Sequence, residues 1–199
     1  TGANLPGGAS ALTKGQLGQI IQTPLYNVVN GIAATNNLAD ALAAATLAGN
    51  RPASLDNGLS KAEIAGIFAG TITHWSQVQG LEALDKPVIL IDRNAGSGAK
   101  AAANQYFLNN PGGLAFSGAI QPANQGAEAG IGDIVNFAAY AVRTEPSAGN
   151  VPGVLNSVFD KGAYGIGILG LENLPSVTSK WRFVAINGAR ATNPAGTAF

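Results

Sequence analysis

A continuous apolar run near the middle of the chain constrains the fold most. Residues Val88, Ile89, Leu90 and Ile91 follow Pro87 with no polar residue between them. Neighbouring side chains in a strand point to opposite faces, so such a run is apolar on both faces. Strands of this kind are typical of parallel sheets covered by helices on both sides. The run therefore predicts a buried strand in an α/β sheet.

A helix is predicted directly after this strand. Residues 92–98 are polar and rich in glycine, as in a turn, and residues 97–108 then have the composition of a helix that Pro111 closes. A second helix is predicted over 60–69, because Ser60 and Glu63 have the spacing of a capping box and Gly70 supplies a stop. Its apolar face consists of Ile64, Ile67 and Phe68.

The other segments continue the alternation of strands and helices. We expect strands at 25–33, 163–169 and 181–186, a mixed segment at 134–142, and helices at 37–48, capped by Asn37, and at 151–159. This order predicts an α/β protein with a mainly parallel sheet flanked by helices in three layers. The strand at 88–91 is expected in a central position, with the helices near 60–69 and 97–108 covering its flanks.

Charged residues are few and balanced. Lys and Arg total 11, Asp and Glu total 11, and charged residues make up 11% of the chain, against about 25% in an average soluble domain. A chain without net charge has no field that attracts nucleic acid or an anionic membrane, so neither is expected as a partner.

The absence of cysteine and the lack of a long apolar run restrict the chain further. With no Cys, disulfides and thiolate metal sites are excluded, and the composition suits a protein outside the cytoplasm. No run reaches the roughly 18 apolar residues of a membrane span, so none is expected. Because the sequence opens with Thr1, we expect a processed or excised product.

The segment with chemical content is the turn between the strand at 88–91 and the next helix. Ligands of open α/β sheets bind at the carboxyl ends of strands, where this turn lies. The backbone N–H groups of Gly98 and Ala99, the hydroxyl of Ser97 and the helix dipole would favour a bound anion, and the planar guanidinium of Arg93 could close on it. These four residues form the candidate anion site.

A plainer interpretation of the same turn stays open. Ser is a preferred N-cap residue, so Ser97 would only cap the helix, and Arg93 would pair with Asp92 or with a surface carboxylate. Spacing alone does not separate this interpretation from an anion site.

The turn and its surroundings resemble the phosphate-binding class of type II periplasmic solute-binding proteins. In that family the turn typically reads Arg-Ser-Asp-Gly-Ser-Gly-Thr, and its Arg, Ser, Gly and Thr hold the anion. Here residues 93–99 read Arg-Asn-Ala-Gly-Ser-Gly-Ala, so Ala99 stands where threonine is expected. The segments LSKAEIAGIFAGTITHWSQV at 59–78 and GAYGIGILGLEN at 162–173 also resemble the family, and the likeness spans roughly 23–188.

The resemblance implies a non-catalytic, extracytoplasmic module that is periplasmic, secreted or on the cell surface and binds an oxyanion such as phosphate. Members are usually longer and take further ligands from a first lobe, for which residues 1–24 leave too little chain. We therefore expect an arm or lobe edge at 1–24, an α/β domain of partial two-lobed architecture at 25–188, and a tail at 189–199. Another copy, or a partner that completes the missing lobe, is the expected macromolecular partner.

Other functional motifs fail. Residues 96–101 imitate the glycine pattern of a dinucleotide site, but no acidic residue follows until Glu128, whereas about 20 residues is the usual interval. His74 is the only histidine and is expected to pack or cap next to Trp75. Ser97 lacks the glycines two residues before and after it that a nucleophile elbow carries. No enzyme activity, cofactor or metal is therefore predicted.

Two function classes remain ahead of an enzyme. The first is an oxyanion-binding module of the solute-binding type. The alternative is a secreted, self-assembling structural subunit of a filament or surface, which reuses this fold without binding a free ligand, because the low charge opposes self-contact only weakly.

Overall fold

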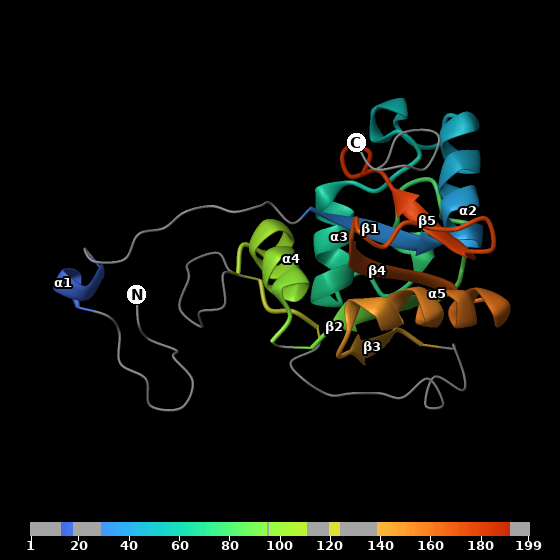
Figure 1. Ribbon diagram of the computed structural model, residues 1–199. Helices are drawn as coiled ribbons and strands as arrows, with labels where there is room; N and C mark the ends of the chain where they lie inside the picture. Colours follow the sequence, from blue (N-terminus) through green and yellow to red (C-terminus); the bar gives the residue numbers. More distant parts are fainter. Residues whose placement is uncertain (1–12, 18–28, 95, 111–119, 124–138, 192–199) are drawn as a thin grey trace.

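Five strands form one mixed sheet in the computed structural model, which describes residues 13–17, 29–94, 96–110, 120–123 and 139–191. The order across the sheet is β3-β2-β4-β1-β5 (Figure 1). The strands are β1 (Asn30–Thr35), β2 (Val88–Arg93), β3 (Ala141–Glu145), β4 (Tyr164–Gly170) and β5 (Trp181–Val184).

Four of these strands run in one direction. β2 pairs in parallel with both β3 and β4, whereas β1 lies antiparallel between β4 and β5. The predicted α/β class and the mainly parallel sheet are therefore confirmed. The strand expected at 25–33 is observed from Asn30 to Thr35, and residues 25–28 lie outside the described part of the chain. Nothing in the local sequence indicated that β1 runs against its neighbours.

Helices cover both faces of the sheet. Helices α2 (Asn36–Leu47), α3 (Lys61–Ala69) and α4 (Gly98–Leu108) pack on one face, where Leu38, Ile64 and Phe107 share a core with Leu90 of β2. Helix α5 (Val151–Asp160) packs on the other face against Ile89 and Ile91. The remaining helical turns among the described residues are α1 (Lys14–Leu17), η2 (Ala53–Leu55), η3 (Trp75–Gln77) and η5 (Ala148–Asn150).

Strand β2 lies in the interior of the sheet and is buried along its whole length. The prediction of an interior strand covered by helices is confirmed. The two helices expected at its flanks, α3 and α4, lie on the same face, and the rings of Phe68 and Phe107 stack between them with centroids 5.9 Å apart. The opposite face depends on α5, which follows β3 and returns the chain to β4.

The helix caps follow local sequence in α3 but not in α2. Ser60 Oγ accepts a hydrogen bond from the Glu63 N–H at 3.1 Å, Glu63 accepts from the Ser60 N–H at 2.8 Å, and Gly70 ends the helix with a left-handed conformation, as predicted. The prediction that Asn37 caps α2 is wrong. Thr35 occupies the N-cap, and the Asn37 amide instead donates to the Ala163 carbonyl at 2.9 Å.

Several expected segments fall outside the described residues. The arm predicted at 1–24 is described only over 13–17, and the tail predicted at 189–199 only as far as 191. In the mixed segment at 134–142, description begins at 139, and β3 follows from Ala141 to Glu145. The proposed domain boundaries therefore stay predictions. Among the described residues, none of the helices has the length and apolar character to cross a membrane.

A buried ion pair ties α3 to the loops before and after it. The guanidinium of Arg51 donates to both carboxylate oxygens of Glu63, at 3.1 and 3.0 Å, and also to the carbonyls of Gly58 and Gln79. Burial alone would raise the pKa of Glu63, but the hydrogen bonds from Arg51 and Ser60 and the charge of Arg51 together lower it. The carboxylate is therefore stabilised in the folded state.

We expect Glu63→Gln to lower the free energy of unfolding by about 3 kcal/mol near neutral pH, because it leaves the buried charge of Arg51 without its counter-ion. A carboxylate with a lowered folded-state pKa contributes stability above its ordinary pKa and loses it as the pH falls through the folded value. The difference between wild type and variant should therefore shrink below about pH 4. Urea unfolding at about pH 7 and pH 3 measures this, and an equal difference at both would contradict the assignment.

Candidate functional site

The candidate site lies where β2 ends and α4 begins. Asp92 and Arg93 are the last two residues of β2, and Ser97 is the N-cap of α4. Ser97 Oγ accepts a hydrogen bond from the Lys100 N–H at 3.4 Å, so the predicted helix start and its serine cap are confirmed. Gly98 and Ala99 belong to the first turn of α4, whose N–H groups have no partner within the helix.

Asp92 is buried and forms an ion pair with Lys100. Its Oδ1 accepts from the Arg93 N–H at 2.7 Å, and its Oδ2 accepts from Lys100 Nζ. Both residues are buried, with 2% and 7% of their surface exposed. The pair therefore joins the end of β2 to the first turn of α4 and fixes the geometry of the turn between them.

Arg93 is buried without a carboxylate partner. Its Nε donates to the Glu145 carbonyl at 3.1 Å and its Nη2 to the Pro146 carbonyl at 3.2 Å, while no carboxylate among the described residues lies within ion-pair distance. Both carbonyls therefore lie at the edge of the guanidinium that Nε and one N–H of Nη2 form. The other end, formed by Nη1 and the second N–H of Nη2, makes no hydrogen bond to a described residue.

A second ion pair lies beside Arg93 on β3. The register places Arg143 opposite Ile91 and Glu145 opposite Arg93, so these side chains share the α5 face of the sheet. Arg143 Nε donates to Glu145 Oε1, and Asn150 Nδ2 donates to Glu145 Oε2 at 3.1 Å. This group was not predicted from the sequence, although the spacing of Arg143 and Glu145 by two residues puts them on one face of a strand.

The charges at this end of the sheet do not balance. Among the described residues, the cations here are Arg93, Lys100 and Arg143, whereas the carboxylates are Asp92 and Glu145. Lys100 pairs with Asp92 and Arg143 with Glu145, whereas no carboxylate of the described part of the chain pairs with Arg93. A buried cation without a counter-ion is costly, and a bound anion would remove that cost.

The predicted site residues lie near one another in sequence, but the structure gives them different partners. Ser97, Gly98 and Ala99 lie together at the start of α4, whereas the Arg93 guanidinium bonds to the loop after β3, and no hydrogen bond joins it to those three residues. Methyl groups built on Gly96 or Gly98 would meet nothing within 4 Å, so the turn borders open space. The plainer interpretation predicted that Ser97 caps the helix and that Arg93 pairs with Asp92 or a surface carboxylate. The serine cap is observed, but Asp92 pairs with Lys100 and not with Arg93.

Other chemistry is not supported by the described part of the chain. There, no group of three or more His, Cys, Asp or Glu residues is arranged to hold a metal ion. His74 occupies the N-cap of η3, where its N–H donates to Gln77 Oε1 at 2.9 Å, as expected for a capping residue.

Comparison with known proteins places most of the chain in one family. Residues 28–177 match the family model of the PBP superfamily domain. None of the curated proteins compared with the chain matches it. The matched range includes β1 to β4 and every residue of the candidate site.

We expect Lys100→Met to destabilise the fold by about 3–5 kcal/mol, because it leaves Asp92 buried and unpaired. The double variant Asp92→Asn, Lys100→Met should recover much of that loss, since neither charge remains. Lys86→Met is the matched control, because Lys86 is exposed. Denaturant unfolding measures the stability of the three variants. If Lys100→Met is as stable as Lys86→Met, the role assigned to the Asp92–Lys100 pair is contradicted.

Proposed function

The chain belongs to the PBP superfamily and therefore has a solute-binding fold, and we propose that its ligand is an inorganic oxyanion such as phosphate. Domains of this superfamily are generally non-catalytic binding proteins and typically lie outside the cytoplasm. We accordingly propose a non-catalytic, extracytoplasmic module. The observation that carries the proposal is the unpaired guanidinium of Arg93.

The donors that Arg93 leaves unused suit an oxyanion. The free end of the guanidinium offers parallel N–H groups from Nη1 and Nη2, a geometry that matches two oxygens of one anion. Backbone carbonyls hold the other edge, so little side-chain entropy is lost on binding. The first turn of α4 adds N–H groups and the positive end of the helix dipole.

The departure from the family pattern limits the affinity we propose. Ala99 supplies only its backbone N–H where a threonine hydroxyl is expected, whereas Ser97, whose oxygen accepts the capping bond, keeps its O–H as a donor. Fewer side-chain donors predict weaker binding than in family members that carry the threonine. A partner lobe, from another chain or another copy, would supply further ligands.

We expect phosphate to bind the wild type and Arg93→Ala to weaken that binding at least thirtyfold, since truncating one partner of a charged contact costs about 2 kcal/mol or more. Isothermal titration with phosphate and with sulfate measures both affinities. Arg182→Ala is the matched control, because Arg182 pairs with Asp40 at the surface. No heat from the wild type with either anion would refute oxyanion binding.

A substitution pair at Gly98 tests the helix amides separately. Gly98 is the first residue of α4, a position that accepts proline, Ser97 before it is extended, and a Cβ there meets nothing within 4 Å. Gly98→Pro thus removes one N–H without disturbing the helix, whereas Gly98→Ala keeps it. We expect the proline variant to bind phosphate about tenfold more weakly than the alanine variant; equal affinities would exclude this amide from the site.

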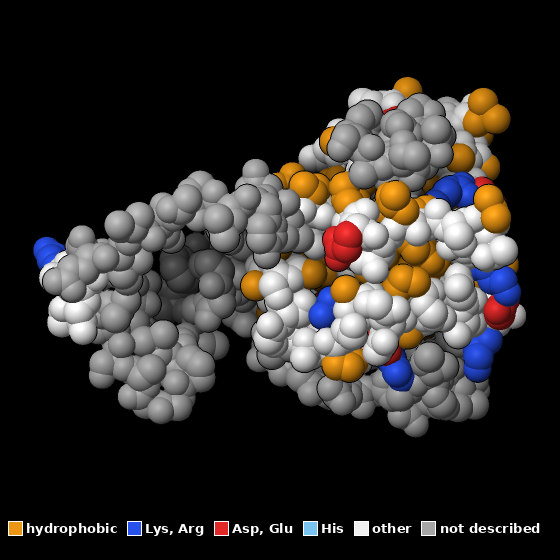
Figure 2. All heavy atoms as spheres, viewed as in Figure 1, with side chains coloured by type: hydrophobic (Ala, Val, Ile, Leu, Met, Phe, Trp, Pro, Cys, Tyr) orange, Lys and Arg blue, Asp and Glu red, His pale blue; other side chains and the backbone are white. Residues whose placement is uncertain are grey.

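A second candidate function, self-association, is favoured by exposed apolar side chains. Leu174 and Val177 lie in the loop between β4 and β5, and Val177 is fully exposed. Figure 2 shows small groups of hydrophobic side chains on the face viewed, with charged side chains of both signs between them and at its edge. Net charge is zero, so little repulsion opposes contact between copies. We propose that this loop joins copies into a secreted assembly.

We expect the sedimentation coefficient of the wild type to rise with protein concentration and Val177→Ser to reduce that rise. Burying one valine contributes about 1.5 kcal/mol, or roughly a tenfold change in association constant. Leu47→Ser is the control, because Leu47 is exposed on α2, outside the loop. A single monomeric species at every concentration would rule out self-association.

A further inference from the structure

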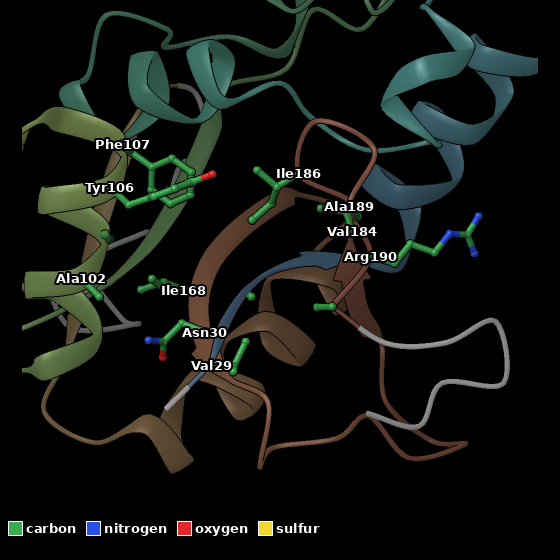
Figure 3. A pocket seen from close by; sticks show the side chains of 13 residues that line it. Val29, Asn30, Ala102, Tyr106, Phe107, Ile168, Val184, Ile186, Ala189 and Arg190 are labelled. Carbon is green, nitrogen blue, oxygen red and sulfur yellow. The ribbon is translucent and has the colours of Figure 1, made fainter. Parts of the chain in front are cut away.

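An open pocket lies on the sheet face that α4 covers, away from the turn at Arg93. Its volume is about 420 Å³, and its walls come from α4 on one side and from residues 186–191 on the other. Figure 3 shows Ala102 and Tyr106 of α4 facing Ile186 and Ala189 across the pocket, with Ile168 of β4 between them. None of Arg93, Ser97, Gly98 and Ala99 lines it.

The interior of the pocket is apolar and belongs to the core. Ile168, Val184 and Phe107 are 3%, 5% and 7% exposed and pack in the same hydrophobic cluster. The rim is also apolar, because Val29 and Tyr106 are each more than half exposed. When an apolar ligand displaces water from such an open apolar surface, the free energy of the system falls, so binding is favoured.

Two neutral polar groups in the pocket lack partners. The side-chain amide of Asn30 and the hydroxyl of Tyr106 make no hydrogen bond to any described residue. They come from different walls, since Asn30 begins β1 and Tyr106 lies on α4 (Figure 3). A ligand between them can therefore be oriented by hydrogen bonds at two ends, the usual arrangement in small-molecule sites.

The charges around the pocket exclude an anion as its preferred ligand. Among the described residues that line it there is no carboxylate, and the one cation, Arg190, donates two hydrogen bonds to Asp56 and points away from the pocket (Figure 3). The ammonium of Lys61 lies over the Tyr106 ring, 4.1 Å from its centroid, and does not line the pocket. The lining is therefore neutral as well as apolar.

We infer that this pocket binds a small, neutral, mainly apolar molecule that carries one or two hydrogen-bonding groups, such as an aromatic amine or phenol. The volume falls within the range of about 300–1,000 Å³ that is usual for small-molecule sites. The site is separate from the proposed oxyanion site and does not depend on it. The ligand inferred for the pocket is neutral, whereas the ligand proposed for the turn at Arg93 is an anion.

The test uses N-phenyl-1-naphthylamine, a neutral dye that fluoresces in apolar surroundings. We expect saturable binding to the wild type, and at least tenfold weaker binding to Ala102→Phe, because the new ring fills the pocket. Ala102 is exposed on α4, so the change leaves the core intact. Ala101→Phe is the matched control, since Ala101 is equally exposed on the same helix and does not line the pocket.

The anionic analogue 8-anilino-1-naphthalenesulfonate tests the ligand class. It carries the same rings and a sulfonate, for which the pocket offers no unpaired cation, so we expect at least tenfold weaker binding at this site. Saturable binding of the neutral dye that Ala102→Phe abolishes and Ala101→Phe preserves supports the inference. No binding to the wild type, equal binding to both variants, or equal affinity for the anionic dye would each overturn it.

Discussion

The burial of β2 to its last residue is the constraint on which the candidate site depends. An interior strand that ends in Asp92 and Arg93 carries two charges into the sheet, and neither can stay there without partners. Because neighbouring side chains alternate, Asp92 points toward α4, where it pairs with Lys100, and Arg93 points toward the loop after β3. The two charges thus hold the strand to the elements on both faces, but only Asp92 meets an opposite charge.

Features that depend on neighbouring residues could be predicted from the sequence. Three such features are observed, and each depends on only a few consecutive residues: the capping box of Ser60 and Glu63, the helix stop at Gly70 and the buried run of β2. The start of α4 at Ser97 is equally local. These elements were enough to predict the α/β class and to place the polar turn at the end of an interior strand.

Features that depend on distant partners could not be predicted. The Asn37 amide donates to the carbonyl of Ala163, 126 residues away. This tertiary contact outweighs the general preference of asparagine for an N-cap. Arg93 donates a hydrogen bond to the Glu145 carbonyl, 52 residues away, and no local pattern predicts that contact. The direction of β1 also depends on β4 and β5, which come much later in the chain. Local spacing therefore identified Arg93 as a candidate but gave neither its partners nor its side of the sheet.

Helix α4 is the element on which both proposed binding sites depend. Its first turn is held to β2 by the Asp92–Lys100 pair, while Phe107 and Leu108 near its end are buried in the core. Between these two anchors, Ala102 and Tyr106 form a wall of the apolar pocket. Both ends of the helix are thus anchored to the sheet, with free amides at its start and the pocket along its side. One helix can therefore contribute both to the proposed site for a charged ligand and to the proposed site for a neutral one.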